Sequence, residues 1–81
     1  MELRPHDLLR IDGPDALVCQ TTCPPWVQSA LERAPYVVVR RQRAATGMVA
    51  VGVRGQTRSE RYAAFLPTGA IRLQITPEHL A

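Results

Sequence analysis

Residues 25–33 carry apolar side chains at the spacing of a helix. The apolar positions that would share one helical face are Trp26, Val27, Ala30 and Leu31. Pro25 suits the first position of a helix, and Pro35 cannot continue one. We therefore predict a helix over residues 25–33.

Alternating and β-branched residues predict strands in the next part of the chain. Residues 36–40 are rich in valine, residues 48–54 alternate valine with smaller side chains, and residues 61–66 form a third apolar stretch. The connections, residues 41–47 and 55–60, are short enough for antiparallel hairpins. A β-meander is expected.

The remaining segments carry weaker signals. Residues 71–75 alternate apolar with polar side chains and predict a fourth strand. Gly52, inside its strand, indicates either a bulge or the close approach of another backbone. Residues 4–11 are predicted to form one helical turn that begins at Pro5. Residues 16–20 form a brief strand or an extended segment leading to the helix.

These patterns predict a single small domain over residues 1–81, of the α+β class. It has a small, mainly antiparallel, three- to four-stranded β-sheet with one main helix, residues 25–33, packed on it. The expected core contains Trp26, Val27, Leu31, Val37, Val39, Val49, Val51, Val53 and Leu66. Residues 76–78, Thr-Pro-Glu, have the features of a helix start, which indicates a piece of something longer; a frayed C-terminal turn is the alternative.

Length and composition narrow the class of protein. With 81 residues, of which 46% are hydrophobic and 21% charged, the chain fits one globular domain. Its longest apolar run, residues 36–39, is too short to cross a bilayer, and the N-terminus lacks the apolar segment of a signal peptide. We therefore expect a cytoplasmic protein with no membrane partner.

Positive charge is concentrated in the second part of the chain. Residues 1–35 contain three arginines and five acids, whereas residues 36–81 contain seven arginines and two acids. On adjacent hairpins, arginines would converge at one edge of the sheet and bind an anionic group. The candidate binding residues are Arg40, Arg41, Arg54, Arg58 and Arg61. The alternative is a solvated edge whose charge prevents aggregation between strands.

The sequence shows no catalytic residue and no metal site. It lacks a Gly-x-Gly-x-x-Gly motif, a P-loop and an Asp-x-Asp pair. His6 and Asp7 are neighbours, but no nucleophile is spaced to use them, so we interpret them as a helix-start pair. Two cysteines and two histidines would suffice for zinc, yet His79 lies far from His6. Cys19 and Cys23 are therefore interpreted as reduced, partly buried thiols.

Four blocks of the sequence have counterparts in a known family: RPHDLL (residues 4–9), VVVRR (37–41), VAVGVRGQTRSERYA (49–63) and ITPEHL (75–80). In this order they resemble the N-terminal region of phosphoribosyl-dephospho-CoA transferases. These enzymes are the holo-acyl-carrier-protein synthases of bacterial malonate decarboxylase. The similarity spans nearly the whole chain.

The resemblance implies part of a nucleotidyltransferase-type enzyme. Such an enzyme transfers the prosthetic group from triphosphoribosyl-dephospho-CoA to a serine of the acidic acyl carrier protein. The family's catalytic Gly-Ser followed by paired Asp belongs to a C-terminal domain and is absent here. The resemblance therefore implies an accessory N-terminal domain, inactive alone, that helps to dock substrate or carrier protein beside the catalytic domain of the same enzyme.

No cofactor is expected in this chain, and Mg²⁺ is expected only with the absent catalytic domain. The alternative is a small, free-standing basic module that binds nucleic acid or another anionic partner. The aromatic residues do not form a stacking motif, which argues against nucleic acid. They are Trp26, Tyr36, Tyr62 and Phe65.

Overall fold

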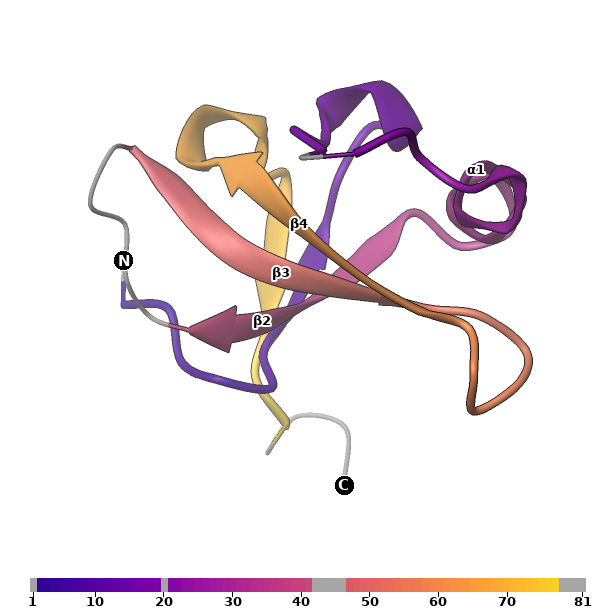
Figure 1. Cartoon of the computed structure of the whole chain (residues 1–81). Helices are drawn as coiled ribbons and strands as arrows, with labels where there is room; N and C mark the ends of the chain where they lie inside the picture. The colour runs from indigo at the N-terminus through magenta and orange to yellow at the C-terminus, as the bar shows by residue number, and fades with distance from the viewer. Residues whose placement is uncertain (1, 20, 42–46, 78–81) are drawn as a thin grey trace.

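An open antiparallel β-sheet organises the computed structural model of the chain, which describes residues 2–19, 21–41 and 47–77 (Figure 1). In chain order the elements are β1 (Leu8–Arg10), the 3-10 helix η1 (Pro14–Ala16), α1 (Pro25–Arg33), β2 (Tyr36–Arg41), β3 (Met48–Arg54), β4 (Arg61–Pro67), the 3-10 helix η2 (Thr68–Ala70) and β5 (Leu73–Ile75). Within these residues the sheet has five strands in the order β4-β3-β2-β1-β5, and each pairs antiparallel with its neighbours. The predicted α+β class is confirmed, with one strand more than expected.

The predicted meander consists of β2, β3 and β4. β3 has the predicted bounds, and β2 and β4 each extend one residue beyond them. β5 is shorter than the predicted residues 71–75, because Ile71 still belongs to the turn that follows η2 and donates its N–H to the carbonyl of Thr68 at 3.3 Å. The three long strands therefore follow from local sequence alone, β2 and β3 from their valines and β4 from its apolar stretch.

Residues 4–11 do not form the predicted helical turn. The chain instead reverses at Pro5 and His6, and His6 has a φ of 75°. A proline followed by a residue with positive φ is the pattern of a type II turn. The chain then extends as β1 between β2 and β5, with Leu9 and Ile11 buried in the core. Pairing with two strands and burial of these side chains outweigh the helix-start signal of the proline.

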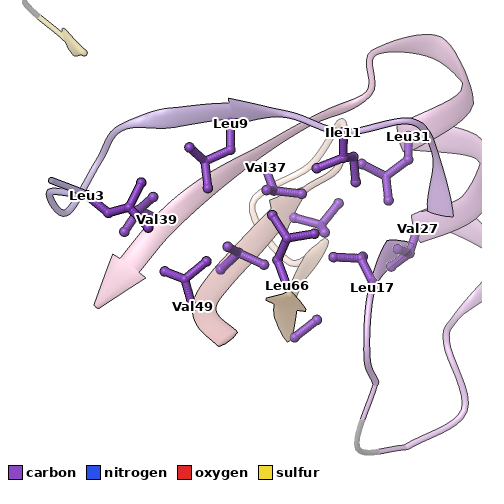
Figure 2. Close-up of a cluster of buried hydrophobic side chains, with 13 residues drawn as sticks. Leu3, Leu9, Ile11, Leu17, Val27, Leu31, Val37, Val39, Val49 and Leu66 are labelled. Carbon is purple, nitrogen blue, oxygen red and sulfur yellow. The ribbon is translucent and has the colours of Figure 1, made fainter. Parts of the chain in front are cut away.

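α1 and one face of the sheet enclose a cluster of buried apolar side chains (Figure 2). α1 spans the predicted residues 25–33 and buries Val27 and Leu31. The predicted core is confirmed except at Trp26, which is only half-buried and packs against the cluster. Five residues outside the predicted set complete this core: Leu3, Leu9, Ile11, Leu17 and Ala64. In Figure 2 the side chains of the N-terminal segment point toward those of β2 and β4.

Two sequence predictions concern irregular parts of the sheet. The segment before α1 is extended at Val18, whose backbone exchanges hydrogen bonds of 2.8 and 3.0 Å with Phe65 of β4. Gly52 itself pairs regularly with Val38, and the bulge lies in β2 between Val39 and Arg41. The nearest neighbour of a Cβ at Gly52 would be the side chain of Arg40 at 3.3 Å, and not another backbone. The helix start predicted at residues 76–78 lies partly outside the described residues.

No helix in the described part of the chain is both long enough and apolar enough to span a lipid bilayer.

Candidate anion-binding site

A groove of about 410 Å³ opens over β2, β3 and β4. Its floor includes small and apolar residues of three neighbouring strands, because Val38 pairs with Gly52 and Gly52 pairs with Ala63. These positions alternate with the buried apolar residues of the same strands, so they belong to the face opposite to the core. The basic residues that line the groove are His6, Arg40, Arg54 and Arg61.

Strand register brings the three arginines together. Arg54, the last residue of β3, pairs directly with Arg61, the first residue of β4. Arg40 lies in the bulge of β2, where the pairing with β3 shifts by one residue. A bulge changes the direction of the side chains it carries. The stem of Arg40 lies across Gly52, since a Cβ atom there would stand 3.3 Å from the Arg40 Cδ.

The described residues do not neutralise the charge of the groove. Within them, none of the three guanidinium groups donates a hydrogen bond or forms an ion pair. Arg72, by contrast, forms an ion pair of 3.0 Å with Asp12. Like charges directly opposite each other on paired strands are destabilising. The pairing of Arg54 with Arg61 therefore weakens the sheet but prepares two guanidinium groups to share one anion.

Glu60, the acid nearest to these arginines in the sequence, closes the loop between β3 and β4. Its Oε1 accepts hydrogen bonds from the N–H groups of Gln56 at 2.8 Å and Thr57 at 3.3 Å. The N–H of Gly55 donates to the carbonyl of Glu60 at 2.8 Å. This carboxylate is thus occupied with holding the hairpin loop.

Of the five predicted binding residues, three line the groove. Arg41 is exposed at the end of β2, opposite Ala50, and Arg58 is exposed in the loop between β3 and β4. Arg40 and Arg54 do not lie at an edge, because β2 and β3 are paired on both sides, whereas Arg61 belongs to β4, an outer strand that Val18 bridges at Phe65. Protection of an edge therefore does not explain Arg40 or Arg54, and anion binding by these arginines stays a prediction.

The side chains of His6 and Asp7 lie in different surroundings. His6 is exposed and lines the groove, a position that sequence reasoning did not assign to it. Asp7 is fully buried, and its Oδ2 accepts hydrogen bonds from the Arg4 N–H at 3.0 Å and from Gln74 Nε2 at 2.7 Å. They are a turn pair and not the predicted helix-start pair. The sequence feature that could have predicted the position of His6 is Pro5, because proline favours a tight turn as well as a helix start.

Cys19 and Cys23 are free thiols, half-buried against the core. Burial raises the pKa of the Cys23 thiol above its ordinary value, and the neighbouring Cys19 raises it further. No group of three or more His, Cys, Asp or Glu side chains in the described part of the chain is arranged to hold a metal ion. His79, a ligand considered for zinc, lies outside that part.

The chain matches the family described as the phosphoribosyl-dephospho-CoA transferase MdcG N-terminal domain over residues 4–77. It is 44% identical over 77 residues to a phosphoribosyl-dephospho-CoA transferase of Azotobacter vinelandii, which covers 95% of this chain and 35% of that protein. Proteins of the same name from Pseudomonas fluorescens and Pseudomonas aeruginosa are 43% identical over 76 residues, 94% of this chain and 36% and 35% of theirs. The chain thus spans about a third of the length of these curated relatives. No solved structure matches it.

Proposed function

Since the chain belongs to the family of phosphoribosyl-dephospho-CoA transferase N-terminal domains, we propose that it is the accessory, non-catalytic domain of such an enzyme. The enzyme would attach the prosthetic group, delivered as triphosphoribosyl-dephospho-CoA, to the acyl carrier protein of malonate decarboxylase in a bacterial cytoplasm. The catalytic domain would lie in the two thirds of the relatives that this chain does not match.

The chain alone is expected to be inactive. Phosphoryl-transfer chemistry depends on groups that position and neutralise phosphates, commonly with Mg²⁺ held by carboxylates. The described residues bring no such carboxylate group together. We therefore assign Mg²⁺ and the reacting serine's activation to the catalytic domain, and binding to this one.

The role that we propose for this domain is the docking of an anionic reactant. The observation that carries it is the groove with Arg40, Arg54 and Arg61, three guanidinium groups without a partner among the described residues. Guanidinium groups bind phosphates and carboxylates through paired N–H donors. Both reactants offer such groups, since the precursor carries phosphates and carrier proteins are acidic. A positive surface also accelerates the encounter with either one.

The test is steady-state kinetics of the transferase that carries this domain, with Arg40, Arg54 and Arg61 all replaced by glutamine. An exposed charge pair contributes about 0.2–1 kcal/mol, so the triple change should raise KM for the precursor or the carrier protein by about 3- to 150-fold. Contacts that are equal in ground and transition states act on KM, so kcat should change much less. The loss should shrink at high salt.

Arg58→Gln is the control, because this exposed arginine lies in the loop between β3 and β4 and does not line the groove. Unchanged KM values for both reactants at low salt, with a folded triple variant, would refute the docking role. Labelled carrier protein produced by the chain alone would refute its assignment as non-catalytic.

A further inference from the structure

The groove is shaped for a small ligand rather than for a flat protein surface. Stable protein partners each bury about 800 Å², whereas binding sites for small molecules are concave and enclose about 300–1,000 Å³. The groove, at about 410 Å³, falls in the second class. Gly52 lies in the middle of the floor, where the missing side chain leaves room for the stem of Arg40.

The floor and the rim offer two different kinds of contact. Val38, Gly52 and Ala63 contribute apolar and small surface, while Arg40, Arg54 and Arg61 contribute guanidinium groups from three adjacent strands. Each guanidinium group has five N–H donors in a planar fork. A tetrahedral phosphate offers enough acceptor oxygens for several forks at once, which one carboxylate does not.

From this geometry we propose that the groove is a binding site for a phosphate ester, with the phosphate held by Arg40, Arg54 and Arg61 and the organic group lying on the floor around Gly52. The proposal rests on the docking role proposed above and narrows it: among the anionic reactants, this groove takes the phosphorylated small molecule, and an acidic protein is the competing occupant. His6, at the turn before β1, lies on the same rim and is available as a further donor.

The experiment is an NMR titration of the ¹⁵N-labelled chain at low salt with inorganic diphosphate, with ADP and with poly-glutamate. We expect saturable shifts at Arg40, Gly52, Arg54 and Arg61 with both phosphate compounds. ADP should bind about 5- to 10-fold more tightly than diphosphate, because its organic group covers apolar surface on the floor. Poly-glutamate should bind weakly.

Three variants separate a built site from general positive charge. Arg54→Gln should weaken diphosphate binding about 5-fold, while Arg33→Gln, the same charge change on α1, should weaken it less than 2-fold. Gly52→Val keeps every charge but fills the floor and displaces the Arg40 stem, which stands 3.3 Å from a Cβ there. It should weaken ADP binding at least 10-fold without unfolding the domain, as thermal melting would verify.

Several results would overturn the proposal. They are equal losses in Arg33→Gln and Arg54→Gln, undiminished ADP binding by folded Gly52→Val, equal affinities for ADP and diphosphate, or groove shifts with poly-glutamate alone. The docking role fails separately: phosphate binding here with unchanged KM values would reject that role and keep the site. A raised KM for carrier protein only, without phosphate binding, would reject the phosphate site and keep the docking role.

Discussion

Replacing Asp7 by alanine is expected to destabilise the domain by about 2–4 kcal/mol. The Asp7 side chain is 0% exposed, and its Oδ2 accepts hydrogen bonds from the Arg4 N–H and from Gln74 Nε2, at 3.0 and 2.7 Å. Hydrogen bonds to a charged group contribute about 1.5–3 kcal/mol each. The cost of burying the carboxylate, whose Oδ1 has no partner among the described residues, offsets part of that sum.

The assay is urea denaturation followed by circular dichroism, with thermal melting beside it. In a domain of this size 1 kcal/mol shifts the melting temperature by about 4–8 °C, so a fall of about 10–25 °C is expected. Asp7→Asn keeps the volume and one acceptor oxygen, and should lose about half as much.

A double-mutant cycle with Gln74→Ala tests the assigned contact directly. Because the two side chains share a hydrogen bond, their coupling energy should be about 1–2 kcal/mol. A loss below 0.5 kcal/mol in Asp7→Ala, on the order of an ordinary surface change, would refute the reasoning. So would a coupling energy of zero, since the tie between the first turn and β5 would then contribute nothing.

Three further predictions address the core, a thiol and a turn. Leu66→Ala should cost about 2–5 kcal/mol in urea denaturation, because this side chain is fully buried, while Leu73→Ala, 47% exposed, should cost far less; equal losses would contradict the assigned core. The raised pKa of Cys23 lowers its thiolate fraction, so this thiol should react with iodoacetamide more slowly at pH 8 in the folded chain than in urea. Mass spectrometry of the labelled peptide would measure both rates, and the difference between them should vanish as the pH rises above that pKa. His6→Gly should leave stability unchanged or raise it by up to about 1 kcal/mol, whereas His6→Val should lower it by about 1–2 kcal/mol, because φ is 75° there; the opposite order in thermal melting would exclude this turn.

Local sequence signals were sufficient for α1 and the meander. Prolines bracket α1, and valines at alternate positions define both the extent and the inward face of β3. β1 could not be found in this way, because three residues are too few to show a period. β1 is extended because Leu9 is buried in the core and its backbone lies between β2 and β5, two strands from distant parts of the chain.

For the site, composition located the positive charge but not its arrangement. The pairing of Arg54 with Arg61 depends on the register of β3 with β4, and the position of Arg40 depends on a bulge in β2 that no sequence pattern predicted. Arg58 was separated from the others because the hairpin loop carries it away from the strands. Gly52 was recognised as unusual, but its actual role, leaving room for the stem of Arg40, depends on the neighbouring strand β2.

The position of β1 in the sheet has a consequence for how a growing polypeptide reaches its final state. The contact between Asp7 and Gln74 joins residues 67 positions apart, and β1 pairs with β5 beside it. β5 is the last strand of the sheet that a ribosome makes, so the outer backbone groups of β1 stay unpaired until β5 joins them. Contacts of long sequence separation form slowly, and open strand edges recruit other chains. The rate at which β5 pairs with β1 should therefore influence how much of the protein aggregates during expression, independently of the stability of the finished domain.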